Sequence, residues 1–412
     1  MKALLIIGDG MADRPLKELG WKTPLEAARK TSMNHLASLG ICGIMDPISP
    51  GTPPGSDTAT LALLGYDPFK VYTGRGAFEA LGWGINVSEG DVCFRCNFAT
   101  VDENLTVLDR RAGRIADDEA SKLAESLREV KLSTAGIEFF FTNTVQHRAV
   151  LVLHGSKLSP RVCDSDPEAV GRKVLEVKPL DETREAYFTA KVLNELTQKF
   201  HKILKNHPVN EARAARGQPQ ANIVLLRGAG TIPKITPLNE NYGVYACCVA
   251  ATSLIRGVCK AAGMQLLDVK GANGTVQTDY SAKAKAAVQA LESHNFVLLH
   301  VKAPDVASHD GNIKQKIEVI EKIDNMLSYI FSKADLSETY VALTADHTTS
   351  CLTRNHEGDP VPLAIRGPHV RSDDVKEFSE RKCAKGGLGR LKGKHLTPIL
   401  MNLIGKVKKF GA

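Results

Sequence analysis

Short apolar runs alternate with longer amphipathic stretches along much of the chain, a pattern typical of buried strands separated by helices. The runs are rich in β-branched residues and have the length of strands at 3–7, 223–226, 244–249, 296–301, 340–343 and 361–365. Helical periodicity lies between them at 250–262, 281–292 and 313–332. Strands that alternate with helices form a parallel sheet with both faces covered, because each crossover helix packs on the sheet. The pattern therefore predicts an α/β fold.

The middle of the chain, from about residue 69 to 220, has a different pattern. Strand-like runs occur at 92–101, 137–145 and 148–153, and helical patterns occur at 117–130 and 182–204. The region ends in a polar segment, 210–220, that contains Gly217 and Pro219. A chain of 412 residues exceeds one ordinary domain. We therefore expect an α+β domain at 69–220, inserted into a discontinuous domain formed by 1–68 and 221–412.

Composition and charge narrow the classes of function. The hydrophobic fraction of 43% and the charged fraction of 24% are those of a globular protein. The net charge of +7 is too small and too dispersed to indicate nucleic-acid binding, but it suits a small anionic substrate. No apolar run reaches the roughly 18 residues that cross a bilayer, and the first run is too short for a secretory signal. Nine cysteines without paired spacing indicate reduced thiols, so we expect a cytoplasmic protein.

Aspartate and histidine side chains follow three of the predicted strands. Asp9 follows the run 3–7, Asp305 and His309 follow 296–301, and Asp346 and His347 follow 340–343. The carboxyl ends of parallel strands meet at one edge of a sheet, so these side chains should converge. One such residue alone is more often a helix cap or a turn residue. Together they predict a site for manganese, zinc or cobalt, with magnesium as an alternative.

A rigid turn precedes the apolar helical run 59–64. Its sequence is GTPPGSDT at 51–58, which puts Ser56 at a helix N-terminus, where free N–H groups and the helix dipole favour an anion. Serine is also a common helix cap. The residues alone leave open whether Ser56 caps the helix, acts as a metal-activated nucleophile that becomes phosphorylated, or does both.

Several specific strings follow one another over the whole chain. They are DGMAD at 9–13, PGSDTA at 54–59, GYDP at 65–68, YTGRG at 72–76, FRCNF at 94–98, D-x-x-x-H at 305–309, ADH at 345–347 and H-x-x-x-PVP at 356–362. With these strings the chain resembles the archaeal-type 2,3-bisphosphoglycerate-independent phosphoglycerate mutases of the alkaline-phosphatase superfamily. The resemblance implies an alkaline-phosphatase-like sandwich with a mostly parallel central sheet.

The resemblance also implies two divalent metal ions, with manganese favoured over magnesium, cobalt or zinc. One ion would be held by Asp305, His309 and His356. The other would be held by Asp9, Ser56, Asp346 and His347. Ser56 would carry the phosphoryl group while 2-phosphoglycerate and 3-phosphoglycerate interconvert in glycolysis and gluconeogenesis. An inserted domain that closes over the site would keep water from the phosphoserine.

Side chains of the expected inserted domain are candidates for substrate binding. Guanidinium groups match carboxylate and phosphate oxygens, although a charged loop cluster can also be merely solvated. Asn97 lies two residues beyond Arg95 and so on the same strand face. The candidates are Arg75, Arg95, Asn97, Arg110, Arg111, Arg114 and His147. The lone pair Cys93 and Cys96 does not indicate a further metal or redox site.

Two other functions stay open. A metal-dependent phosphatase, phosphodiesterase or phosphopentomutase of the same superfamily would share the metal ligands but not the strings around Arg75 and Arg95. A catalytically silent metal-binding regulatory protein would keep the fold, but the complete ligand set argues against it. The sequence indicates neither the general acid/base residue nor the oligomeric state, so a homo-oligomer also stays open.

Overall fold

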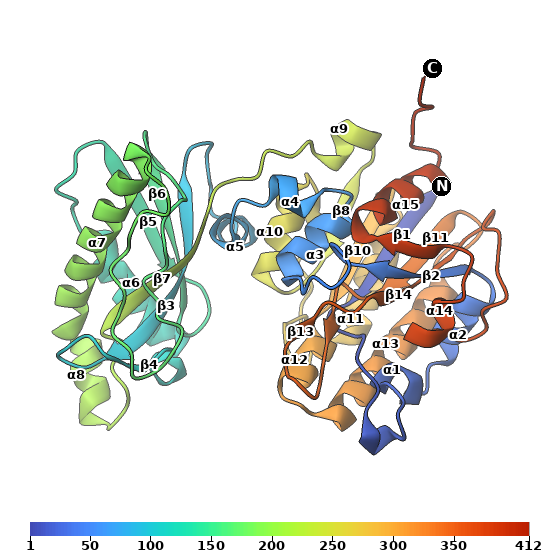
Figure 1. The fold of residues 1–412 in the computed structure, drawn as a ribbon, viewed down its shortest axis with the longest axis horizontal. Helices are drawn as coiled ribbons and strands as arrows, with labels where there is room; N and C mark the ends of the chain where they lie inside the picture. The colour runs from blue at the N-terminus through green and yellow to red at the C-terminus, as the bar shows by residue number, and fades with distance from the viewer. Residues whose placement is uncertain (412) are drawn as a thin grey trace. The chain divides into compact units, whose positions relative to one another are not determined.

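The protein is described by a computed structural model that covers residues 1–411. The chain divides into two compact units. The first consists of Met1–Tyr72 together with the chain from Lys234 onward, and the second is Thr73–Pro233. Figure 1 draws the second unit in light blue to yellow-green. Within the described residues, no helix is long and apolar enough to cross a membrane.

The first unit is built on an eight-stranded sheet with the order β15-β2-β14-β11-β1-β10-β8-β9. The strands are β1 (Lys2–Gly8), β2 (Ile41–Asp46), β8 (Ala246–Val249), β9 (Gln265–Leu266), β10 (Phe296–Val301), β11 (Thr339–Thr344), β14 (Val361–Arg366) and β15 (Gly389–Lys392). Strand β14 runs antiparallel to β11 and β2, and the other pairs are parallel. All residues of β10 and β11 are buried, as expected for a sheet covered on both faces. The predicted α/β fold with a mostly parallel sheet is confirmed.

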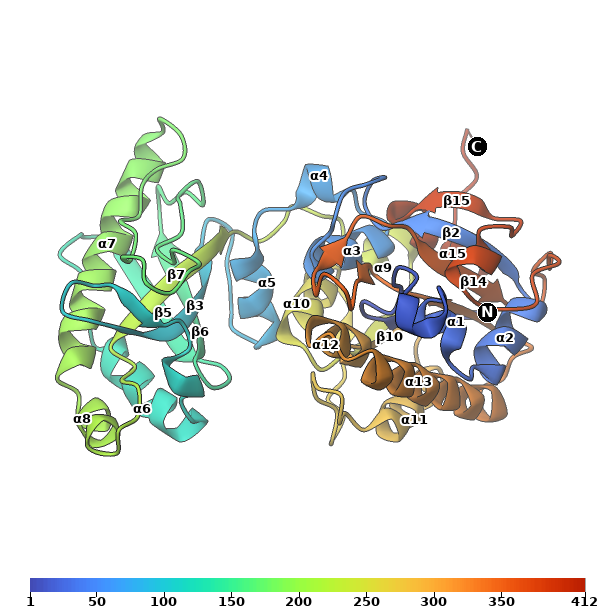
Figure 2. The same ribbon diagram turned by 60° about the horizontal axis from the view of Figure 1, so that its bottom comes forward.

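Helices of the first unit cover this sheet. Helices α1, α2 and α11 each contact α13, and α3 contacts α10; α11 and α13 lie side by side in Figures 1 and 2. The helices of this unit are α1 (Pro24–Ala27), α2 (Thr31–Ser38), α3 (Ser56–Leu63), α4 (Pro68–Val71), α9 (Leu238–Tyr242), α10 (Ser253–Ala261), α11 (Tyr280–Ala290), α12 (Ala303–His309), α13 (Ile313–Lys333), α14 (Glu380–Cys383) and α15 (Leu396–Leu403). A two-stranded hairpin, β12 (Thr348–Thr349) with β13 (His356–Glu357), stands apart from the main sheet.

The second unit has an antiparallel sheet in which β3 pairs with β4, β6 and β7, and β6 pairs with β5. Its elements are α5 (Arg75–Gly82), β3 (Val92–Val101), β4 (Val107–Asp109), α6 (Asp117–Arg128), β5 (Ile137–Asn143), β6 (Arg148–Gly155), α7 (Arg184–Lys205), α8 (Pro208–Ala215) and β7 (Ile223–Gly230). One face of β3 packs with α6 and α7, whereas Cys93 on the other face packs with α5. Cys93 and Cys96 therefore point to opposite faces.

The strand predicted at 223–226 belongs to the second unit and not to the parallel sheet. It forms β7, which pairs antiparallel with β3, so the second unit continues to Pro233, beyond the expected boundary at 220. The polar segment 210–220 begins within α8. The buried Asn210 amide bonds Leu204 O, Ala221 O and Ala221 N, which joins α8 to the start of β7. An apolar run shows that a strand is buried, but not in which sheet.

Candidate active site

Three neighbouring parallel strands end level with one another and bring the predicted ligands together. Ile7 of β1 lies opposite His300 of β10 and Thr344 of β11. The residues that follow these strands therefore emerge at one edge of the sheet. Asp9, Asp346 and His347 are completely buried there, and Asp305 in the first turn of α12 is 2% exposed.

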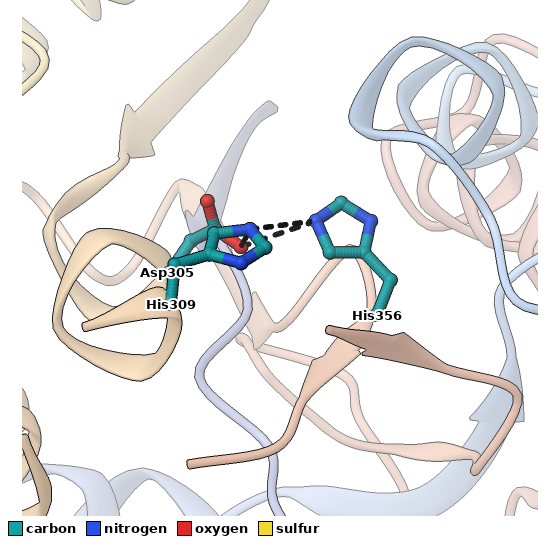
Figure 3. A group of neighbouring side chains, drawn as sticks. All are labelled: Asp305, His309 and His356. Atoms are coloured by element: carbon teal, nitrogen blue, oxygen red, sulfur yellow. Dashed lines mark hydrogen bonds and ion pairs between the residues drawn. The ribbon is translucent and has the colours of Figure 1, made fainter. Parts of the chain in front are cut away.

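A first group of ligand atoms consists of Asp305, His309 and His356 (Figure 3). Asp305 and His309 are four residues apart on α12, so they share one helix face. The Asp305 Oδ1 atom lies 3.3 Å from the Nε2 atoms of both histidines, and those two Nε2 atoms are also 3.3 Å apart. Three donor atoms at mutual distances of this size fit the coordination shell of one divalent ion.

Backbone carbonyls orient both histidines of this group. His309 Nδ1 donates to Arg354 O at 2.7 Å, and His356 Nδ1 donates to Pro54 O at 2.7 Å. In a neutral ring with a protonated Nδ1, the lone pair is on Nε2, the atom that faces Asp305. The hairpin of β12 and β13 pairs Thr349 with His356 and so returns His356 to the site.

A second group consists of Asp9, Asp346 and His347. His347 Nε2 lies 3.3 Å from Asp9 Oδ1 and 3.4 Å from Asp346 Oδ2. The Gly10 N–H donates to Asp346 Oδ1 at 3.0 Å and joins the loop after β1 to the loop after β11. Gly10 has φ of 61°, and a Cβ there would lie 2.4 Å from Thr349 Oγ1. Only glycine fits this close approach.

Ser56 is the first residue of α3, and the N-cap is Gly55. The Ser56 side chain is therefore not the helix cap. Its Oγ atom lies 3.1 Å from His347 Nε2 and accepts a hydrogen bond from Lys302 Nζ at 3.2 Å. The residue is 4% exposed. The nucleophile predicted from the sequence thus lies beside the second group of ligands.

Lys302, which was absent from the predicted site, links both groups. Its ammonium lies 2.6 Å from Asp305 Oδ2 and 3.0 Å from Asp9 Oδ1. Burial alone would lower the pKa of Lys302, but the carboxylates Asp9, Asp305 and Asp346 raise it above its ordinary value. The only sequence signal for this residue was its place between β10 and Asp305.

This environment shifts the pKa values of the buried carboxylates in opposite directions. Burial would raise the pKa of Asp305, but the Lys302 ammonium together with the neighbouring His309 and His356 side chains holds it well below its usual range. The pKa of Asp9 is lowered in the same way, since Lys302 and the neighbouring side chains of His300 and His347 together outweigh its burial. Burial and the Asp9 charge instead raise the pKa of Asp346 well above the ordinary value. A compact set of buried carboxylates with one ammonium is a site that favours cations.

In the second unit, polar side chains gather on the β3 face opposite α6 and α7. Arg95 and Asn97 alternate there with Phe94, Cys96 and Phe98, which face the core. Arg95 Nε, Asn97 Oδ1 and His147 Nδ1 are buried without a hydrogen-bond partner among the described residues. Burial lowers the pKa of Arg95 to about 10, and burial followed by the Arg148 charge lowers that of His147 to about 4.

Other arginines surround these side chains. The charges of Arg75, Arg148 and Arg227 depress the pKa of Arg95, and those of Arg111 and Arg114 depress that of His147. Arg110 differs, because its guanidinium bonds the buried Asp166 carboxylate through Nε at 3.0 Å and Nη2 at 2.7 Å. The sequence also missed Arg227, which forms ion pairs with Asp166 and Glu168.

Comparisons with known proteins show the family of this chain. Residues 37–210 match the family model described as 2,3-bisphosphoglycerate-independent phosphoglycerate mutase. A protein of that name from Methanocaldococcus jannaschii is 49% identical over 411 residues, which is 100% of this chain and 99% of the relative. One from Thermococcus kodakarensis is 49% identical over 413 residues, with the same coverage. The chain belongs to the 2,3-bisphosphoglycerate-independent phosphoglycerate mutase family. It is an isomerase, as the resemblance implied.

Solved structures show the fold of this enzyme family. A protein from Pyrococcus horikoshii aligns with a TM-score of 0.88 at 40% identity, over 100% of this chain and 99% of that one. A cofactor-independent phosphoglycerate mutase from Thermoplasma acidophilum aligns with a TM-score of 0.72 at 36% identity, over 98% of this chain and 100% of that one. The enzyme therefore shares its fold with proteins of clearly related sequence over its full length.

Proposed function

We propose that this enzyme interconverts 2-phosphoglycerate and 3-phosphoglycerate through a phosphoserine at Ser56, beside two bound divalent ions. The observation that carries the proposal is the position of Ser56 Oγ. It is buried at the start of α3, within 3.2 Å of both Lys302 Nζ and His347 Nε2. It lies beside the two groups of candidate ligands. Lys302 contacts one carboxylate of each group, Asp305 of the first and Asp9 of the second.

The donor atoms fit two divalent ions. One would be held by Asp305, His309 and His356, and the other by Asp9, Ser56, Asp346 and His347. Mixed carboxylate and imidazole donors favour manganese, with cobalt, zinc or magnesium as alternatives. When bound, such ions stabilise negative charge on the transferring phosphoryl group and on the attacking and leaving oxygens.

The chain's own residues support phosphoryl transfer to Ser56. As the Oγ–P bond forms and the bond from phosphorus to the substrate oxygen breaks, the serine gives up its proton and the released hydroxyl gains one. The Lys302 ammonium donates to Oγ and stabilises the negative charge that develops there. The free N–H groups at the start of α3 favour the phosphate that Ser56 then carries. In the return step the other glycerate hydroxyl bonds to phosphorus and loses its proton, while the Oγ–P bond breaks and Ser56 regains a proton.

We further propose that the basic face of the second unit binds the glycerate. Arg95, Asn97 and His147 offer buried polar atoms without partners among the described residues. Arg75, Arg111 and Arg114 add positive charge around them. A guanidinium is the side chain best suited to hold a carboxylate or phosphate. Arg110 forms an ion pair with Asp166. We therefore expect Arg110 to act on this site only through the Asp166 carboxylate.

Trapping of the phosphoenzyme tests the proposal. The enzyme is mixed with radiolabelled 3-phosphoglycerate, quenched with acid, and digested for mass spectrometry of the peptide that contains Ser56. We expect label on Ser56, no label and no mutase turnover in Ser56→Ala, and normal labelling in the control Ser38→Ala, whose residue lies on α2. Normal turnover by Ser56→Ala, or label on another residue, would contradict the proposal.

A further inference from the structure

A buried histidine that the proposed ligand sets leave out faces the same carboxylates. His300 is on β10 and is completely buried, as are Asp9 and Asp346. One donor atom from each of these three residues lies within 4.8 Å of the other two, as the ligands of one ion do. The backbone carbonyl of His300 accepts from Lys283 Nζ at 2.7 Å, which fixes the strand at this position.

The polar atoms that converge here have no hydrogen-bond partner among the described residues. They are Asp9 Oδ2, Asp346 Oδ2 and both ring nitrogens of His300. The second oxygen of each carboxylate is engaged, since Lys302 donates to Asp9 Oδ1 and Gly10 donates to Asp346 Oδ1. Leaving a buried polar atom without a partner is unfavourable, so a cluster of them in one place indicates a missing ligand.

The spacing of the closest pair fits two ligands of one ion, although a hydrogen bond has the same length. Asp9 Oδ2 and His300 Nε2 are 2.9 Å apart, yet neither atom has a hydrogen-bond partner among the described residues. Two ligands at right angles around an ion, each about 2.1 Å from it, are separated by about 3 Å. A neutral imidazole offers such an ion a lone pair.

We propose that His300 is a direct ligand of the ion held by Asp9 and Asp346, an inference that rests on the two-metal site of the proposed function. The second ion then has imidazole donors from β10 and from the loop after β11, namely His300 and His347. A second imidazole favours manganese, cobalt or zinc over magnesium, which prefers oxygen donors. The same ring would therefore contribute to the choice of metal.

Nuclear magnetic resonance of the full enzyme, labelled with 15N-histidine and loaded with 113Cd²⁺, tests this directly. A one-bond coupling between 113Cd and 15N appears only for a nitrogen bound to the metal. We expect four coupled histidines: His309, His356, His347 and His300. The coupled signal of His300 should disappear in His300→Gln and persist in His294→Gln, whose residue hydrogen bonds Gln265 outside the site.

The outcomes separate this inference from the proposed function. Two bound cadmium ions with three coupled histidines, and no loss of coupling in His300→Gln, would overturn the role of His300 and leave the two-metal site intact. No bound cadmium would overturn both. The number of coupled histidines in the unmodified enzyme decides the question even if His300→Gln does not fold. A hydrogen-bonding role for His300 would give no coupling to cadmium.

Discussion

The buried ammonium of Lys316 should hold together the two loops of the first unit that carry predicted metal ligands. Lys316 lies in the first turns of α13 and is completely buried. Its Nζ donates to Ala12 O at 3.1 Å and to Asp13 Oδ2 at 2.9 Å, both in the loop after β1. It also donates to Thr349 O at 2.7 Å, in the segment after His347. One side chain thus joins the loop of Asp9 to the loop of Asp346 and His347.

Lys316→Met should destabilise the first unit strongly. Removal of one partner from a buried ion pair costs about 3–5 kcal/mol, because the other charge stays buried without compensation. The Asp13 carboxylate would keep its hydrogen bonds from the backbone N–H groups of Arg14 and Cys351, but it would lose its ion pair with the Lys316 ammonium. The matched control is Lys30→Met. Lys30 is also buried, but it contacts Glu377, whose side chain is 38% exposed, so we expect a loss of only about 0–1 kcal/mol.

Native-state hydrogen exchange of the β1 and β11 amides measures the opening free energy of this unit without assuming that the whole chain unfolds in one step. We also expect the double variant Lys316→Met with Asp13→Asn to lose less stability than the sum of the single changes, by about 1 kcal/mol or more. Two results would refute the proposed link between the loops: equal losses of stability in Lys316→Met and Lys30→Met, or strictly additive losses from the changes at 316 and 13.

Three further predictions concern the substrate face and buried acids. Arg95→Ala should lower mutase activity by about 10- to 150-fold and raise the fraction of turnover that releases inorganic phosphate; an unchanged fraction, as expected for exposed Arg172→Ala, would argue against a substrate contact. Burial raises the pKa of Glu380 to about 7 from an ordinary 4.5, so the folded state binds more protons than the unfolded state between these values. The free energy of unfolding, relative to that of Glu380→Gln, should therefore fall as the pH rises between these two values. Urea titrations at several pH values measure this difference, and a difference that does not change with pH would contradict the assignment. Because burial and Arg148 lower the pKa of His147 to about 4, its ring nitrogens should keep the chemical shifts of a neutral imidazole from pH 8 to pH 5.

The convergence of Asp9, Asp305 and Asp346 could be predicted from the sequence, because it follows from local pattern and one rule of topology. Each residue comes just after a buried parallel strand, and such strands end at a common edge. The helical spacing of Asp305 and His309 also fixes their common face. The structure brings all seven predicted metal ligands into one unit, although whether each of them binds a metal stays a prediction.

Other parts of the site depend on contacts that local pattern does not encode. In the sequence, Lys302 and His300 lie at the end of an apolar strand, and nothing there indicates a role in the site. Only their distances to Asp9 in the structure indicate one. The same is true of Lys316, which bonds residues more than 300 positions earlier in the chain. Strand β2 was missed because Gly43 interrupts its apolar run, and β15, which pairs with β2, was missed as well.

The central claim, a metal-dependent mutase that needs no bisphosphoglycerate, is tested most directly by activity after metal removal and return. The purified enzyme is stripped with a chelator, its metal content is checked by elemental analysis, and the conversion of 3-phosphoglycerate is followed without 2,3-bisphosphoglycerate. We predict no activity in the stripped enzyme and recovery with Mn²⁺ or Co²⁺ alone, with a plateau at about two ions per chain. Full activity in a sample with no measurable metal would contradict the account.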